Sequence, residues 1–301
     1  MTLIDLITEE AARLKGAGVS FGHGTLNAFD EAAWLVLRSL GRDLDALEAH
    51  AHDVLAPAAL AKARALITRR IETRQPAAYL TREAWLQNVP FDVDERAIVP
   101  RSYIAELLAD GEGTGILDAW LTERTRRVLD LCTGNGSLAV IAALAYPEVV
   151  VDASDVSADA LAVARRNVER HGLAQRITLI ESDLYANVRG PYDLILCNPP
   201  YVNDASLAAL PPEYRAEPRL ALAGGVDGMD LVRPIVREAA RHMTPDAVLV
   251  LEIGHERAHF EAAFPRLEVA WLETAGGDDK VLVATRDALV QVAADAGRRA
   301  R

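Results

Sequence analysis

The regular alternation of short apolar runs with helical segments after residue 126 is the feature that most constrains the fold. Short apolar runs bounded by turn residues are typical of buried strands, and apolar residues spaced three and four apart are typical of helices. Strands that alternate with helices predict an α/β protein with a parallel, doubly wound, Rossmann-like sheet. The expected strands are RRVLDLC (126–132), VVVDASD (149–155), RITLIES (176–182), YDLILCN (192–198) and AVLVLEI (247–253). The expected helices are the alanine-rich segment after the first strand, Ser157 to His171 and Asp230 to Met243. An antiparallel hairpin is expected to close the sheet, with EVAWLE (268–273) and KVLVAT (280–285) as its strands.

The N-terminal residues have a different pattern, with apolar stripes at helical spacing and no strand-like run. They predict a small helical domain over residues 1–78. The stripes start at Leu3, Phe29 and Leu60, with Asn27 or Asp30 as the N-cap of the second helix and Pro57 at the start of the third.

Two short alternating runs after Ala84 predict a β-hairpin, with its turn at Gln87–Pro90. This hairpin is expected to form a linker over residues 79–102. The remaining residues, 103–301, then form the α/β domain.

The formal net charge of −12 constrains the partners. Nucleic-acid-binding proteins usually carry a basic face, but the first 110 residues hold 12 Lys and Arg against 16 Asp and Glu. No direct recognition of nucleic acid is therefore expected. An acidic balance is typical of soluble proteins, and it would also attract a basic partner such as a ribosomal protein; both interpretations stay open.

Features of targeting or disulfide formation are absent from the sequence. The N-terminus lacks the apolar segment of a signal peptide, and no apolar run reaches the roughly 18 residues needed to span a bilayer. Cys132 and Cys197 flank strand-like runs and are expected to be reduced thiols. We expect a cytoplasmic protein without membrane contact.

A glycine-rich turn follows the first expected strand, in DLCTGNGSLAV. Gly134 and Gly136 allow a tight turn and close approach of a ligand before the next helix. Asp155 ends the second strand, where a carboxylate accepts hydrogen bonds from both hydroxyls of a ribose. This pair fits a nicotinamide dinucleotide and S-adenosylmethionine equally well.

Three further observations favour S-adenosylmethionine. Asp130 lies at the turn, where it would repel a pyrophosphate but attract a cationic amino-acid group. Asp183 ends the third strand, where it can accept a hydrogen bond from an adenine amino group. The glycine turn contains no Arg or Lys for a phosphate. The alternative for Asp130 and Asp183 is ordinary helix N-capping.

The segment Asn198-Pro199-Pro200-Tyr201 ends the fourth expected strand. Proline has a fixed φ and no N–H, so the segment is rigid and rich in acceptors. The Asn198 side-chain oxygen and the Pro199 carbonyl suit a planar –NH2 group with two hydrogens, and the Tyr201 ring can stack on it. The alternative is a rigid turn without a function.

These motifs together resemble the amino-group methyltransferases that use S-adenosylmethionine, and in particular the HemK-type protein-glutamine methyltransferases. RQPAAYL (74–80), IVPRS (98–102) and EPRLALAGGVDGMDL (217–231) stand in the order of that family. The resemblance covers nearly the whole chain. It implies a class I methyltransferase fold, S-adenosyl-L-methionine as cofactor, and methyl transfer to the amide nitrogen of a glutamine in a protein.

Two stretches, 21–37 and 93–102, are similar to the branch of the family that acts on the large-subunit ribosomal protein L-three. The release-factor branch usually has a proline and an acidic-threonine-acidic run after its "PR", and here Ser102 follows Arg101. The N-terminal domain is then expected to help hold the protein substrate, a glutamine-containing segment of a ribosomal protein. The predicted catalytic residues are Asn198, Pro199 and Tyr201; the predicted substrate contacts are Asn198, Pro199, Pro200, Tyr201 and Arg101; the predicted cofactor contacts are Asp130, Cys132, Thr133, Gly134, Asn135, Gly136, Asp155, Val156, Asp183, Leu184 and Asn198.

Four alternatives remain open. One is a release-factor glutamine methyltransferase, and another is an adenine methyltransferase of nucleic acid with the same four-residue motif, which would need a basic recognition surface. A third is a zinc protease, because HERAH (255–259) fits H-E-x-x-H with His255 and His259 as zinc ligands. The sequence offers no obvious third ligand, however, and no metal is expected. The last is a binding module without activity.

Overall fold

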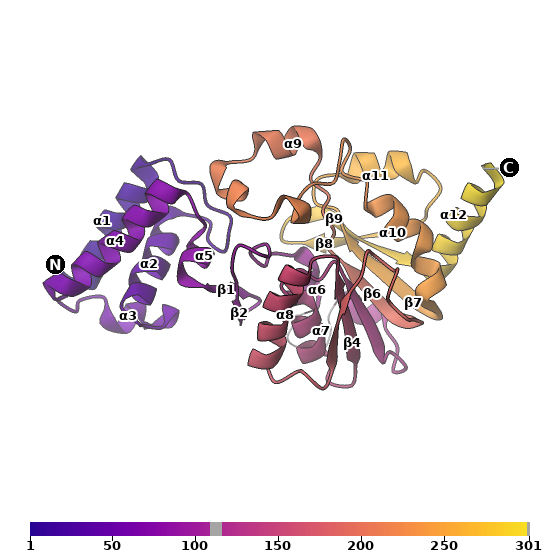
Figure 1. Ribbon diagram of the computed structural model, residues 1–301, viewed down its shortest axis with the longest axis horizontal. Coiled ribbons are helices and arrows are strands. Elements are labelled where there is room, and N and C mark those ends of the chain that lie inside the picture. Colours follow the sequence, from indigo (N-terminus) through magenta and orange to yellow (C-terminus); the bar gives the residue numbers. More distant parts are fainter. Residues whose placement is uncertain (109–115, 300–301) are drawn as a thin grey trace.

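The computed structural model describes residues 1–108 and 116–299, which form a helical N-terminal part and a larger α/β part (Figure 1). The N-terminal helices lie at one end of an elongated molecule, and a two-stranded hairpin separates them from a seven-stranded sheet. This is the predicted order of the three parts. The boundaries at 78/79 and 102/103 stay predictions, and residues 109–115 and 300–301 of the third part lie outside the described residues.

Local capping explains where the N-terminal helices begin. Thr2 and Asp5 form a capping box at the start of the first helix, with the Asp5 N–H donating to Thr2 Oγ1 at 3.3 Å. Asn27, not Asp30, caps the second helix, and Pro57 occupies the first turn of the fourth. The elements of this part are α1 (Leu3–Gly16), α2 (Ala28–Ser39), a 3₁₀ helix (Leu44–Ala46), α3 (Leu47–His50), α4 (Pro57–Thr73) and α5 (Ala77–Thr81); α3 and α5 lie outside the predicted stripes.

The predicted hairpin consists of β1 (Glu83–Leu86) and β2 (Val89–Asp92), which pair antiparallel. Its turn is shorter than predicted. Gln87 and Asn88 both have positive φ, as a two-residue turn of type I′ requires, whereas Pro90 already pairs with Trp85 in the ladder.

The large sheet has the strand order β5-β4-β3-β6-β7-β9-β8. Strands β3 to β7 are parallel, and β9 runs antiparallel to both of its neighbours, as the closing hairpin predicts. Since β3 lies between β4 and β6, the chain leaves its carboxyl end at the switch point where such sheets bind ligands. The strands are β3 (Arg127–Leu131), β4 (Val150–Asp155), β5 (Ile177–Glu181), β6 (Tyr192–Cys197), β7 (Met243–Glu252), β8 (Ala270–Thr274) and β9 (Gly277–Thr285).

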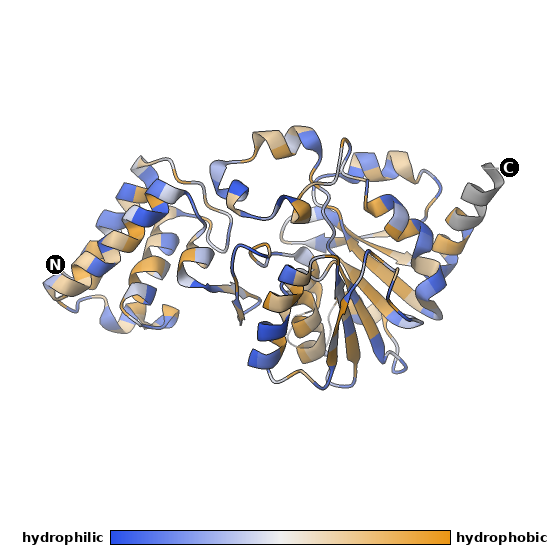
Figure 2. Ribbon diagram, in the orientation of Figure 1, coloured by the Kyte–Doolittle hydropathy of each residue, from blue (hydrophilic) through white to orange (hydrophobic). Residues whose placement is uncertain are grey.

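Alternate residues of the central strands face opposite sides of the sheet and enter two separate apolar clusters. Val128 and Leu194 pack toward one side, and Leu129 and Ile195 toward the other. Figure 2 shows these strands mainly in the hydrophobic colour, between helices of mixed hydropathy. The helices of this part are α6 (Tyr103–Leu108), α7 (Ser137–Ala145), α8 (Ala158–Arg170), α9 (Asp204–Ala209), α10 (Val232–Glu238), α11 (Arg257–Ala263) and α12 (Arg286–Arg299), with 3₁₀ helices at Ile116–Trp120, Pro212–Ala216, Arg219–Ala221 and Ala239–His242.

Two predicted helix boundaries are wrong. The helix expected over Asp230 to Met243 begins at Val232, tightens into a 3₁₀ turn from Ala239, and ends where Met243 starts β7. The sequence pattern also missed α12, which packs on β7 and β9. Within residues 1–108 and 116–299, no helix combines the length and apolarity that a membrane span needs.

Buried ion pairs join the two parts of the molecule. Arg70 of α4 is fully buried and donates to Glu31 of α2 at 2.8 Å. Its guanidinium also lies 3.4 Å from Glu213, in the segment that follows α9. Figure 1 shows this segment extending from the α/β part toward the N-terminal helices. The contact fixes the helical part against the sheet part.

Candidate functional site

The turn after β3 adopts left-handed backbone conformations that the following helix requires. Gly136, with φ 80°, is the N-cap of α7, and a Cβ there would come within 3.0 Å of Ala164 Cβ on α8. Cys132 has φ 64° and Leu184, after β5, has φ 47°, although neither is a glycine. Residues in such strained conformations are stabilised by the surrounding structure, and they are common at functional sites. Both residues line the cavity described next.

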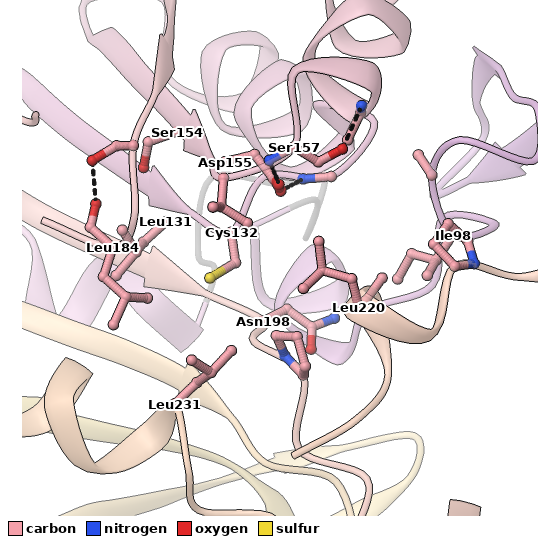
Figure 3. A pocket seen from close by; sticks show the side chains of 18 of the residues that line it. Ile98, Leu131, Cys132, Ser154, Asp155, Ser157, Leu184, Asn198, Leu220 and Leu231 are labelled. Carbon is pink, nitrogen blue, oxygen red and sulfur yellow. Dashed lines mark hydrogen bonds between the residues drawn. The ribbon is translucent and has the colours of Figure 1, made fainter. Parts of the chain in front are cut away.

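A cavity of about 230 Å³ lies at the carboxyl ends of β3, β4 and β6. Figure 3 shows Asp155 and Asn198 on opposite sides of it, with the Cys132 sulfur and several leucines around them. Of its lining residues Arg96 alone is cationic, and Asp94 binds that guanidinium at 2.8 and 2.9 Å. The lining residues are Arg96, Ala97, Ile98, Leu131, Cys132, Gly134, Ser154, Asp155, Val156, Ser157, Ala160, Ser182, Asp183, Leu184, Asn198, Pro200, Pro218, Leu220, Ala221 and Leu231.

The Asp155 carboxylate is held by the backbone on both sides. Its two oxygens accept from the N–H groups of Gly134 and Ser157, each at 2.9 Å. Burial raises the pKa of this carboxyl despite these bonds. Since each oxygen has a further lone pair, Asp155 can still accept hydrogen bonds from a ligand in the cavity.

Asp130 is fully buried beneath the glycine turn. One of its oxygens accepts from Thr133 Oγ1 and from the Ala139 N–H at 2.9 Å, so it caps the start of α7. Its other oxygen has no hydrogen-bond partner among the described residues. Burial raises the pKa of Asp130 to about 7. The contacts of Asp130 are therefore those of a helix N-cap, the alternative interpretation of this residue. A contact of Asp130 with a cofactor stays a prediction.

The predicted cofactor residues divide into two sets by their position. Asp155 and Asn198 line the cavity together with Cys132, Gly134, Val156, Asp183 and Leu184, and Asp183 is exposed at its rim. The other set builds the turn beneath: Asp130, Thr133, Asn135 and Gly136 do not line the cavity. Sequence reasoning missed Ile98 and Leu220, although both lie in stretches that carried the family resemblance.

A smaller cavity of about 110 Å³ adjoins the first. The two cavities share Ile98, Asn198 and Ala221 as lining residues, so Asn198 stands at their junction. The smaller one is otherwise lined by Arg101, Pro199, Tyr201, Val202, Leu210, Tyr214 and Leu222.

The Asn198 side chain has a defined orientation. Its Nδ2 donates to the carbonyl oxygen of Arg101 at 3.3 Å, and only the amide nitrogen can make this contact. The Oδ1 atom is consequently left as an acceptor at the junction.

The Tyr201 hydroxyl is anchored. It donates to Glu252 at 3.1 Å, and burial raises its pKa well above the usual value. The ring packs against Gly254, where a Cβ would come within 2.5 Å of it. Tyr201 therefore supports the wall of the smaller cavity and is not set to ionise.

The Arg101 guanidinium is engaged as well. It binds both carboxylate oxygens of Glu217, at 2.6 and 2.7 Å, and lies 5.3 Å from the centre of the Tyr214 ring. A direct contact of this side chain with a substrate stays a prediction.

The H-E-x-x-H match does not form a metal-binding helix. α11 begins at Arg257, so His255 precedes it, and His255 Nδ1 lies 2.7 Å from Lys280 Nζ. His259 bonds instead to Glu256, at 2.6 Å. In the part of the chain that the structure describes, no three metal-binding side chains gather into a site.

Known proteins are similar to this chain over almost its full length. A family model described as "Methyltransferase small domain" matches residues 110–210. The "Ribosomal protein uL3 glutamine methyltransferase" of Bordetella pertussis is 53% identical over 289 residues, which are 96% of this chain and 96% of that protein. The protein of the same name from Burkholderia pseudomallei is 51% identical over 300 residues, 97% of each chain. A solved structure of the hMettl16 catalytic domain in complex with "MAT2A 3'UTR hairpin 6" is 14% identical, with a TM-score of 0.49, over 76% of this chain and 82% of that one.

Proposed function

The chain belongs to the family of ribosomal protein uL3 glutamine methyltransferases, and from this we propose that it methylates the side-chain amide nitrogen of a glutamine in ribosomal protein uL3. The family resemblance drawn from the sequence is thereby confirmed. Two cavities meet at Asn198, and this observation assigns the proposed reaction to particular residues. One cavity suits a methyl donor and the other a small planar side chain.

The larger cavity fits S-adenosylmethionine better than a nicotinamide dinucleotide. Asp155 offers acceptors for two ribose hydroxyls, and the apolar side chains around it suit an adenine ring. The only lining cation, Arg96, is bound to Asp94, so a pyrophosphate would lack a free partner there. When bound, S-adenosylmethionine supplies an electrophilic methyl group on a sulfonium sulfur.

The smaller cavity offers acceptors for an amide –NH2 group. Asn198 Oδ1 is available as an acceptor because Nδ2 is the atom that contacts Arg101, and the Pro199 carbonyl lies between two prolines that have no N–H. Two acceptors that bind both N–H bonds hold the nitrogen in one orientation. An amide nitrogen is a weak nucleophile, so catalysis here consists mainly of placing it at the junction of the two cavities.

The N-terminal part is proposed to hold the protein substrate. Together with Trp85 of the hairpin it forms a groove of about 290 Å³, lined among others by Phe29 and Trp34. Phe29 and Trp85 are each 40% exposed, and exposed aromatic side chains are enriched at protein interfaces. Asp30 also lines the groove, and the net charge of −12 complements a basic ribosomal protein.

A direct test uses purified enzyme, S-adenosylmethionine and three candidate substrates: uL3, a release factor, and adenine-containing DNA or RNA. We expect one methyl group on one glutamine of uL3 by peptide mass spectrometry. Methylation of the release factor or of nucleic acid in preference to uL3 would contradict the proposed substrate. Absence of methyl transfer to all of them would contradict the proposed activity.

A further inference from the structure

Two buried carboxylates hold the segment from Val99 to Tyr103. Glu217 accepts from the Val99 N–H at 2.9 Å, before Arg101. Glu252 accepts from Ser102 Oγ at 2.6 Å and from the Tyr103 N–H at 2.9 Å, after it. Arg101 lies between these anchors, and its carbonyl is the group that receives the Asn198 N–H.

The side chain of Arg101 is fixed by Glu217 as well. Two parallel N–H···O bonds, at 2.6 and 2.7 Å, join the guanidinium to the carboxylate, and this geometry allows one orientation only. The Glu217 side chain is fully buried. Its burial alone would raise its pKa, but the charge of Arg101, the nearby His23 and the hydrogen bonds from Arg101 outweigh burial and lower the pKa of Glu217 to about 2.

We propose that Glu217 is a positioning residue for methyl transfer: by holding Arg101 it fixes the carbonyl that turns Asn198 Oδ1 toward the substrate amide. The inference rests on the proposed function. It assigns a role to a residue that touches neither the methyl donor nor the amide.

Glu217 also faces the N-terminal part, since His23 Nε2 lies 3.4 Å from its carboxylate. A loss of activity in a Glu217 variant has two possible causes: a displaced Asn198 or a displaced N-terminal part. Glu213 provides the matched control. It lies four residues earlier, and its side chain is fully buried like that of Glu217. It contacts Arg70 and Arg74 of the N-terminal part and not Arg101.

The first experiment compares Glu217→Gln with Glu213→Gln. Glutamine keeps the volume but offers one acceptor oxygen and no charge to Arg101. We expect kcat on uL3 to fall about 10- to 100-fold in Glu217→Gln, the range for a small misplacement of a catalytic group. KM for uL3, and the Kd for S-adenosylmethionine measured by calorimetry, should stay within about twofold, because the groups that bind them are retained. Glu213→Gln should retain kcat. An equal loss of kcat in both variants, or none in Glu217→Gln, would overturn the proposal.

The second experiment asks whether Glu217 acts through Asn198. If it does, Glu217→Gln costs nothing further once Asn198 is alanine, so the double variant should match Asn198→Ala. Multiplied losses in the double variant would overturn the proposal.

The wild-type enzyme in the same assay distinguishes failure of the proposed function from failure of the positioning role. No methyl transfer by wild type would refute the proposed function. Normal transfer by a folded Glu217→Gln variant would refute only the positioning role. Should Glu217→Gln fail to fold, Arg101→Lys replaces it, because lysine keeps the charge but cannot form the paired bonds. A smaller loss of kcat is then expected, again absent in the Asn198→Ala background, and its persistence there would overturn the proposal.

Discussion

The side-chain nitrogen of Asn198 lies 3.3 Å from the carbonyl oxygen of Arg101, 97 residues earlier in the chain. A carbonyl oxygen can only accept, so the contact fixes which end of the amide faces the protein. The oxygen of Asn198 is left at the junction of the two cavities. The rigid Asn-Pro-Pro-Tyr segment thus has a defined acceptor, which a simple turn would not need.

Asn198→Ala should reduce turnover far more than cofactor affinity. It removes an acceptor for the substrate amide and leaves the amide free to rotate. Loss of such an orienting bond costs about 3–4 kcal/mol, or about 10²–10³ in single-turnover rate. Asn198→Asp keeps an acceptor but adds a charge and loses the donor to Arg101, so it should be impaired as well. Near-normal methyl transfer by the alanine variant would mean that the segment is only a turn.

Asp155→Ala should weaken binding of S-adenosylmethionine. The variant loses a charged acceptor for the ribose, worth about 2–3 kcal/mol, or roughly 30- to 150-fold in Kd by calorimetry. Asp155→Asn keeps one acceptor oxygen and should lose less. An unchanged Kd in the alanine variant would remove the ribose assignment, and tight NADH binding without binding of S-adenosylmethionine would overturn the cofactor proposal.

The parts of the fold that sequence predicts are those with local causes. Strand periodicity located β3 to β9, and the caps at Asn27 and Pro57 depend on residues within one turn of the helix. The same holds for the glycine turn and for Asp155 at the end of its strand. α12 was missed because its cap, Thr285, is also the last residue of β9, so the strand pattern conceals the start of the helix.

The parts that sequence could not predict depend on distant contacts. Arg101 pairs with Glu217, which lies 116 residues away, and Ser102 with Glu252, 150 residues away. The sequence motifs that contain Arg101 and Glu217 were recognised, but no local feature of the sequence predicts that these side chains pair. Cys132 and Leu184 adopt left-handed conformations that their own preferences disfavour, so only the surrounding fold accounts for them.

The buried carboxyl of Asp130 should make stability depend on pH. Its pKa is about 7 in the folded state, against 3.8 as the ordinary value, so between these values the folded state binds the extra proton. The free energy of unfolding should therefore fall as pH rises toward 7 and level off above it. Asp130→Asn keeps an acceptor for Thr133 and Ala139 but cannot titrate. Relative to this variant, wild type should lose about 1 kcal/mol per pH unit between pH 5 and 7 in urea unfolding. A constant difference would show that Asp130 is ionised throughout.

Arg70→Met should destabilise the protein strongly. The substitution leaves Glu31 buried without its cation, while Glu213 keeps Arg74, and breaking a buried pair costs about 3–5 kcal/mol. The measurement is urea unfolding at neutral pH. Arg82→Met is the control, because its ion pair with Glu95 is exposed and worth less than about 1 kcal/mol. Similar small losses in both variants would mean that the buried pair contributes little to stability.

Phe29→Glu tests whether the N-terminal groove holds uL3. Phe29 is 40% exposed at the start of α2, so glutamate there can be solvated and is compatible with the helix N-terminus. It would place a charge where we expect apolar side chains of the substrate. Loss of one anchoring contact costs about 1–2 kcal/mol, so KM for uL3 should rise about 5- to 30-fold. The kcat value and the Kd for S-adenosylmethionine should be unchanged, because the cavities at Asn198 are intact.

Val290→Glu is the matched control: Val290 is 42% exposed on α12, at the opposite end of the molecule (Figure 1), and its substitution should leave KM unchanged. An unchanged KM in Phe29→Glu, or an equal rise in both variants, would remove the groove from the substrate-binding surface.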